Sequence, residues 1–400
     1  MVPYEYLQNK ERTTTMTQTE LYSTRLSDII ATVNHIEPKR VPVVAYHMTW
    51  PVGYKDVDIE ETFNSTEKFV DVFSSVFEDV YADAQISIAP PNSLKANKMI
   101  GARTFTISPD KRSFQHTAIY PMEYEDYPEV IKNHKKWHLN VGVLRKFPML
   151  TKMTKQEVKE LFISIAFELE RTTQSHNALK NKVQKDYSIV PLTGGGFYNS
   201  PFDLIFDRLR GFKNTLVDIR RCPQQVLDLV EAVKPEYINP LNNIKTNFPY
   251  FMCFPHAPSF LGPARFEKFY WPTLKVQLNK IIEMGQRPIL ALEGTWQPLL
   301  EIMADGLPDN GLIVSVENDE PREVRRVLGK KAALLAGVPS VTMKYENEET
   351  CKDCAKKLID DLAPGGGFLY AGDKGLMTVK DIDTKNYIAI QKFVHEYGKY

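Results

Sequence analysis

Ionisable side chains that can bind metals follow apolar segments at two neighbouring points of the sequence. His256 comes after the strand-like segment FPYFMCF and Pro255, and Glu293 directly follows the apolar segment PILAL. The residues between them include RFEKFYWPTLKVQLNKIIEMG, which has the periodicity of an amphipathic helix. Parallel strands joined by helices end at one edge of a sheet, so we expect the two side chains to meet there.

A third residue of this kind, Asp373, follows the apolar segment GGFLYAG. Imidazole and carboxylate groups bind zinc, and three protein ligands leave one coordination position open for substrate. The sequence therefore predicts a zinc site formed by His256, Glu293 and Asp373. Glu293 is also the predicted catalytic residue. Burying a carboxylate inside a barrel costs free energy unless the carboxylate is paired with a positive charge or bound to a metal. Three alternatives stay open: a loop histidine without a metal, a Glu293–arginine ion pair, and an Asp373 that caps a helix or turn.

The elements that would position these residues alternate between strand and helix patterns. Apolar strand candidates lie near residues 41, 80, 189, 248, 288, 311, 332 and 366. This alternation is typical of an α/β protein, and we predict a (β/α)8 TIM barrel, with an open doubly wound sheet as the alternative. The segment RTFTISPDKRSFQHTAI predicts a hairpin in a long excursion between the second and third barrel strands. Residues 1–24 are expected to form a polar N-terminal arm, and residues 25–400 a single barrel domain.

The composition narrows the function classes. Fifty basic and fifty acidic residues balance, so no basic excess points to nucleic acid or to an anionic membrane. No apolar run is long enough for a membrane span, and the first twenty residues lack the apolar core of a signal peptide. Four cysteines in 400 residues do not make a disulfide framework. We expect a cytoplasmic protein.

Two tempting motifs have structural explanations. Cys351 and Cys354 form a Cys-x-x-Cys pair, but they lie on a helical pattern without a second ligand pair nearby. Cys253 is expected to be a buried apolar residue. The segment Thr193-Gly-Gly-Gly-Phe197 lacks the lysine of a phosphate loop. We interpret it as a tight turn after a strand, with Phe197 against the substrate.

Several segments, in one order, resemble the uroporphyrinogen decarboxylase superfamily, and most closely its corrinoid-linked methyltransferase branch. The resemblance runs from about residue 25 to the end of the chain. It is carried by EPKRVPVV (37–44), PFDLIFDRLRG (201–211), DIRRCPQQVLDLVE (218–231), FLGPARFEKFYWPTLKVQL (260–278), ILALEGTW (289–296), VLGKKAALLAGVP (327–339) and GGGFLYAGDKGL (365–376).

The departures from the family pattern also carry information. The arginine-rich loop of the true decarboxylases is replaced by AYHMTWPVGY (45–54). The His-x-Cys and Cys zinc ligands of the thiol methyltransferases correspond here to Ala291, Glu293 and Asp373. A subgroup with Glu-Gly at the fifth strand and His after the fourth is more similar, and it is associated with corrinoid-dependent demethylation of methoxylated aromatics. Its Asn-Val-Pro motif is replaced by Gly337-Val-Pro here.

The resemblance implies a zinc-dependent transfer of a methyl group from an O-methylated, aromatic donor. The acceptor would be the cobalamin of a separate corrinoid protein, because this chain has no Asp-x-His-x-x-Gly signature. Tyr46, His47 and Trp50, which follow the first strand, are predicted to line the substrate pocket.

Other functions stay open. A metal-independent decarboxylase or lyase would need pocket cations, for which Arg103, Arg208, Arg210 and Arg265 are candidates. A corrinoid-to-folate, pterin or thiol methyltransferase and a non-catalytic relative are further alternatives. The sequence also leaves open whether the chain forms a homodimer.

Overall fold

The computed structural model describes residues 16–87, 93–103, 105–117, 119–192, 197–243 and 250–400, without the side chains of residues 87, 197, 198, 242 and 243. The strands in these ranges are β1 (Val44–His47), β2 (Ala84–Ser87), β3 (Phe105–Ile107), β4 (Phe114–His116), β5 (Val190–Pro191), β6 (Phe197–Tyr198), β7 (Tyr250–Cys253), β8 (Arg287–Leu292), β9 (Leu312–Val316), β10 (Ala332–Ala336) and β11 (Phe368–Tyr370).

Helices follow most strands. In the first half of the chain they are α1 (Gln18–Val33), α2 (Trp50–Tyr54), α3 (Ile59–Asn64), α4 (Thr66–Ser74), α5 (Leu94–Met99), α6 (Tyr127–Lys132), α7 (His134–Trp137), α8 (Val143–Lys146) and α9 (Lys155–Tyr187). In the second half they are α10 (Pro201–Asp203), α11 (Phe212–Arg221), α12 (Pro223–Ile238), α13 (Pro258–Leu261), α14 (Pro263–Arg265), α15 (Trp271–Glu283), α16 (Leu300–Gly306), α17 (Pro321–Leu328), α18 (Ser340–Tyr345), α19 (Glu348–Leu362) and α20 (Thr384–Tyr397).

All the described strands except β3 and β4 form parallel sheets, which is typical of an α/β fold. One sheet has the order β11-β10-β9-β8-β7-β6 and another the order β1-β2-β5, and a parallel bridge between Val43 and Tyr370 joins them. Neighbouring strands follow the order of the sequence, whereas strand order reverses in a doubly wound sheet, so that alternative is wrong. All eight predicted strand positions are confirmed. Because β5 and β6 are separated by residues outside the described ranges, closure of the barrel stays a prediction.

The core has two layers that follow from strand alternation. Along each strand, alternate side chains point to an inner apolar cluster. The side chains between them point to the helices outside. Ile29 and Val33 of α1 belong to the inner cluster and cover one end of it. Inner residues from the strands include Val44, Tyr46, Ala84, Ile86, Val190, Leu192, Tyr250, Met252, Ile289, Ala291, Ile313, Ala333, Leu335 and Leu369.

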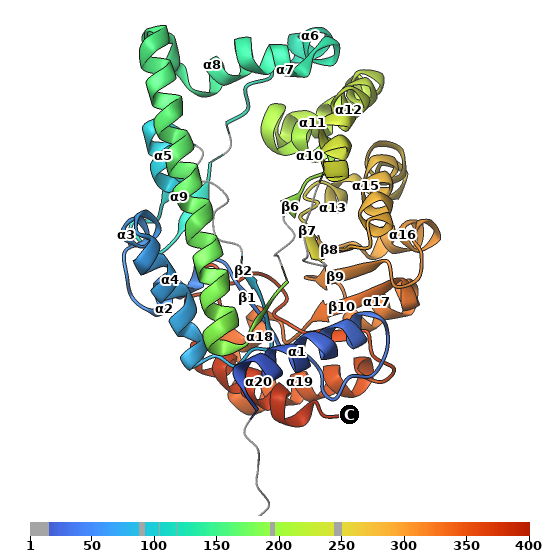
Figure 1. The fold of residues 1–400 in the computed structure, drawn as a ribbon. Coiled ribbons are helices and arrows are strands. Elements are labelled where there is room, and N and C mark those ends of the chain that lie inside the picture. Colours follow the sequence, from blue (N-terminus) through green and yellow to red (C-terminus); the bar gives the residue numbers. More distant parts are fainter. Residues whose placement is uncertain (1–15, 88–92, 104, 118, 193–196, 244–249) are drawn as a thin grey trace, which may run out of the picture.

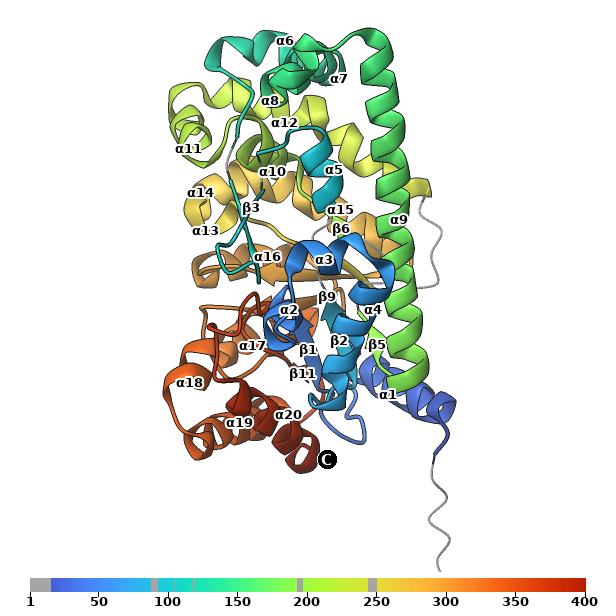
Figure 2. The same cartoon turned by 90° about the vertical axis from the view of Figure 1, so that its left-hand side faces the viewer.

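The predicted excursion is present and mostly helical. β3 and β4 form the expected antiparallel hairpin, and α6, α7 and α8 lie at the end of the molecule opposite α19 and α20 in both views (Figures 1 and 2). The 33-residue helix α9 returns along the side of the molecule from these helices to the sheet. Among the described helices, none combines the length and apolar composition needed to cross a bilayer.

The N-terminal arm is shorter than predicted. Helix α1 begins at Gln18, so residues 18–24 are helical rather than part of a polar arm. The reason is local: the Thr17 side chain accepts a hydrogen bond from the Glu20 backbone, and the Glu20 carboxylate accepts one from the Thr17 backbone. Arg25 of the same helix forms a buried ion pair with Asp83, at 3.0 Å, which ties α1 to the sheet.

Candidate functional site

The predicted convergence of His256 and Glu293 is present at the carboxyl ends of β7 and β8. Inner residues recur at every second position along these strands, and the same alternation reaches the two side chains just beyond the strand ends. The distance from His256 Nε2 to Glu293 Oε2 is 3.7 Å. Their side chains are 42% and 46% exposed, so both are accessible to a ligand.

Asp207 completes this site and was missed by sequence reasoning. It lies on the π-helical turn Leu204–Leu209, and its Oδ2 atom is 2.7 Å from His256 Nδ1. This contact fixes the ring so that Nε2 faces Glu293. A carboxylate on one ring nitrogen leaves the other available for a metal or for a substrate proton.

The charges around the imidazole favour its protonated form. Burial alone would lower the pKa of His256, but the Asp207 hydrogen bond and the charges of Asp207, Glu293 and Asp203 raise it to about 9. Burial raises the pKa of Glu293, although the charge of His256 opposes this rise. Without a metal, the pair therefore carries a proton at neutral pH that can be donated or displaced.

A buried carboxyl group holds the backbone after His256 in place. Asp203 accepts hydrogen bonds from the Ala257 backbone N–H, at 3.2 Å, and from the Tyr270 hydroxyl. Burial and the nearby charge of Asp207 raise the pKa of Asp203. Because Asp203 and Asp207 are four residues apart on one short helical segment, that segment anchors both His256 and the loop that follows it.

The loop after Glu293 is held by carboxylates from the end of β9. Glu317 accepts a hydrogen bond from the Gly294 backbone N–H at 2.7 Å, and Asp319 accepts one from that of Trp296 at 2.7 Å. Gly294 has a φ of +77°, and a Cβ there would lie 3.0 Å from Ser259, so this turn requires glycine. Glu317 was also missed, although it continues the inner alternation of Ile313.

Among the predicted substrate-binding residues whose side chains the structure describes, Tyr46 lies in the inner cluster of the strands. It is buried in the inner cluster, and burial together with the charges of Glu293 and Glu317 raises its pKa well above the usual range. Its phenol therefore stays protonated and can donate a hydrogen bond beside the two carboxylates.

His47 and Trp50 lie elsewhere. His47 points out of the sheet, opposite to Tyr46, where its Nε2 atom is 2.9 Å from the Tyr387 hydroxyl. Its ring stacks on Trp50 with centroids 5.0 Å apart, and Trp50 stacks on Tyr54. Both residues are buried, so we no longer expect them to contact substrate. The physical reason is strand alternation: a strand that directs Tyr46 inward directs His47 outward.

Asp373 is also separate from the pair. Its carboxylate accepts hydrogen bonds from the Ser340 backbone N–H, at 2.9 Å, and from the Ser340 hydroxyl, so it caps the start of α18. Among the described residues, no three His, Cys, Asp or Glu side chains are grouped to hold a metal. The structure thus brings together two of the three predicted ligands.

The structure describes the predicted cysteines but not the predicted glycine-rich turn. Cys351 lies on the buried face of α19 with Ala355 and Leu358, as expected, and Cys253 is buried in the outer core. The Thr193–Gly196 turn and the side chain of Phe197 lie outside the described residues.

The candidate pocket arginines differ in their burial. Arg210 is buried and donates to Asp218, at 2.7 Å, and to the Met122 backbone carbonyl, so it supports the fold. Arg103, Arg208 and Arg265 are exposed. Among the described residues, Glu293 pairs with His256 and forms no ion pair with an arginine.

Comparison with known proteins supports the fold. No family model matches the sequence, and no curated protein matches it. A methyltransferase from Methanosarcina mazei has a similar structure, with a TM-score of 0.63 and 17% identity over 94% of this chain and 98% of that chain. This shows that the two chains share a fold, and it agrees with the resemblance to the uroporphyrinogen decarboxylase superfamily at that level. A B12-independent methionine synthase from Shewanella sp. W3-18-1 aligns over 51% of this chain and 60% of that chain, at 11% identity and a TM-score of 0.34, which is too low to indicate a shared fold.

Proposed function

We propose that this protein is a zinc-dependent methyltransferase built on a (β/α)8 barrel. It would move a methyl group from an O-methylated, aromatic donor to the cobalamin of a separate corrinoid protein. The observation that carries the proposal is the His256–Glu293 pair, oriented by Asp207 at the carboxyl edge of a sheet. The fold shared with a methyltransferase supports the class of reaction.

His256 and Glu293 are the residues that would hold the zinc. An imidazole nitrogen and a carboxylate oxygen 3.7 Å apart suit two ligands of one ion, and Asp207 supplies the carboxylate that commonly orients a zinc-bound histidine. Asp373 is excluded from the proposed set because Ser340 occupies its carboxylate. Zinc bound by these groups would act as a Lewis acid on the oxygen of the methyl donor.

The other side chains would bind the donor and manage its charge. Tyr46 would hydrogen-bond the donor oxygen, because its phenol is protonated and the charge of Glu293 acts on it. The leaving oxygen gains negative charge as the methyl group departs, and donors in a water-poor site stabilise such charge. Tyr46 is buried among inner apolar residues such as Ala291, so this part of the site is less open to water than the His256–Glu293 pair.

Methyl transfer followed by absorbance tests the proposal. Wild-type protein is mixed with free cob(I)alamin, or with reduced corrinoid protein, and a panel of methoxylated phenols. We expect conversion to methylcobalamin with at least one phenol, and loss of this activity in Glu293→Gln. Decarboxylation of uroporphyrinogen without any methyl transfer would instead support the decarboxylase alternative. Transfer from a folate or to a thiol, with no methoxylated phenol active, would assign a different methyl donor or acceptor.

A further inference from the structure

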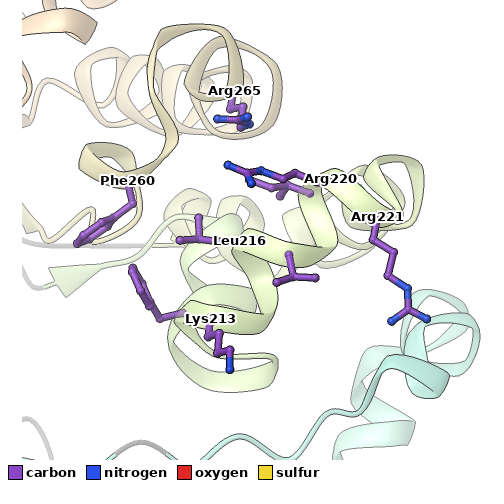
Figure 3. Close-up of a pocket in the computed structure, with 9 residues that line it drawn as sticks. Lys213, Leu216, Arg220, Arg221, Phe260 and Arg265 are labelled. Carbon is purple, nitrogen blue, oxygen red and sulfur yellow. The ribbon is translucent and has the colours of Figure 1, made fainter.

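A basic groove lies beside the candidate site, on the surface formed by α11 and the α13–α14 segment. Its volume is about 620 Å³, and Figure 3 shows the residues that line it. Its lining residues include Phe212, Lys213, Arg220, Arg221, Phe260 and Arg265.

The groove has an aromatic part that is open to solvent. The rings of Phe212 and Phe260 lie 4.8 Å apart in an edge-to-face contact, and both pack against Phe206. Phe212 is 42% exposed and Phe260 is 54% exposed. Two adjacent exposed phenylalanines favour contact with an apolar group, because covering them removes apolar surface from water.

The rest of the groove is positively charged. Four of its lining residues are basic, and none of the described lining residues is acidic. Arg221 stacks over the ring of Tyr124 at 3.8 Å. Arg220 and Lys213 have no ion pair within the described part of the chain. Figure 3 shows Arg220 and Arg265 facing the same space. Since the whole chain has zero net charge, this positive charge is a local excess.

Both walls of the groove are close in sequence to residues of the candidate site. Phe206, which supports the aromatic part, precedes Asp207, and α13 begins two residues after His256. A partner bound in the groove would therefore lie next to the edge where His256 and Glu293 meet.

We propose that the basic groove docks an acidic segment of the corrinoid protein, with a carboxylate between Arg220 and Arg265 and an apolar side chain on Phe212 and Phe260. This inference rests on the proposed function. Charge complementarity selects an acidic partner. A protein segment fits better than a small anion, because a small anion bound by the arginines would leave the exposed phenylalanines in water.

Charge reversal in the groove tests this inference. Two reactions are compared for the Arg220→Glu/Arg265→Glu variant: methyl transfer to free cob(I)alamin, and methyl transfer to the cob(I)alamin-loaded corrinoid protein of the same organism. We expect kcat/KM for the corrinoid protein to fall at least about tenfold at low salt, with a smaller loss at high salt. The rate with free cob(I)alamin should not change. Phe260→Ala should weaken the corrinoid-protein reaction with little salt dependence.

Lys385→Glu is a single charge-reversal control at a distant position. Lys385 is an exposed lysine of α20, at the end of the molecule away from α11 in both views (Figures 1 and 2). It reverses one charge without touching the groove, so both reactions should keep their wild-type rates. All substituted side chains are exposed, and thermal unfolding verifies that each variant is folded.

The possible outcomes separate this inference from the proposed function. Unchanged kcat/KM for the corrinoid protein in the double variant would overturn the docking site. Equal loss in both reactions would show that the groove holds a small anionic ligand and would also overturn it. If the wild-type protein methylates neither free nor protein-bound cobalamin, the proposed function fails. Binding of the wild-type protein to the corrinoid protein, measured by sedimentation, then tests the docking site independently. Binding that the double variant abolishes would support the groove, and absence of wild-type binding would overturn it.

Discussion

Replacing Asp207 by Asn is expected to lower the pKa of His256 in the metal-free protein. The carboxylate of Asp207 lies 2.7 Å from Nδ1 and is the leading group that raises this pKa to about 9. A hydrogen bond to a charged group contributes about 1.5–3 kcal/mol, and one pKa unit corresponds to about 1.4 kcal/mol. The Asn variant should therefore titrate about 1–2 pH units lower than wild type.

Histidine NMR measures this titration directly. The chain has eight histidines, so the His256 resonance can be assigned by its loss in His256→Gln. Glu293→Gln is the comparison, because Glu293 is 3.7 Å from Nε2 and acts through its charge, so its removal should shift the pKa less than removal of Asp207. An unchanged His256 titration in Asp207→Asn would refute the assignment of Asp207 as the orienting carboxylate.

The same substitution has a predictable effect on stability. The pKa of His256 is raised from 6.5 in the folded protein, so its contribution to stability is complete below about pH 6.5 and is lost as pH rises through about 9. The side chain is 42% exposed, and solvent screening limits this contribution to about 1 kcal/mol. Denaturant unfolding should show the largest difference between wild type and Asp207→Asn near pH 6, and a smaller one near pH 9.

Three further predictions concern the metal and its neighbours. Glu293→Gln should lose most of its zinc, measured by elemental analysis of the purified protein, while its unfolding midpoint stays close to wild type; full zinc content would contradict the ligand assignment. Asp373→Asn should keep its zinc and lose about 1 kcal/mol of stability, because it weakens only the cap of α18; zinc loss there would restore Asp373 as a ligand. Cys351→Ser/Cys354→Ser should keep zinc and turnover and lose about 1–3 kcal/mol in thermal or denaturant unfolding, because a hydroxyl replaces the buried Cys351 thiol; zinc loss would mean that the pair binds metal.

Alternation along the strands explains which parts of the site could be predicted from the sequence. His256 and Glu293 lie just past the ends of apolar strands. The pattern within each segment was therefore enough to predict that both lie at one edge of the sheet. The same pattern contained Glu317, which lies two residues beyond Ser315 and four beyond Ile313, both on β9, and it could have been found in this way. Applied to β1, it would also have separated the inward Tyr46 from the outward His47.

Other features depend on contacts that no local pattern reveals. Asp207 lies on a π-helical turn, where the usual helical spacing does not indicate the direction of a side chain. Asp373 comes three residues after β11 ends at Tyr370, so strand alternation no longer fixes its direction. Its partner, Ser340, lies 33 positions away in the sequence. The shortened N-terminal arm is the exception, since the Thr17 and Glu20 capping box could have been read directly.

The signs of charge at the two surfaces argue for different ligands. Carboxyl groups of Asp203, Asp207 and Glu293 all act on one imidazole, so the site is rich in negative charge. Such a site attracts a cation and repels a polyanionic tetrapyrrole, which agrees with a metal centre better than with porphyrinogen decarboxylation. The adjacent groove carries Arg220 and Arg265 instead. An acidic partner would be drawn to the groove and kept out of the site, so that only its uncharged reactive centre approaches the methyl donor.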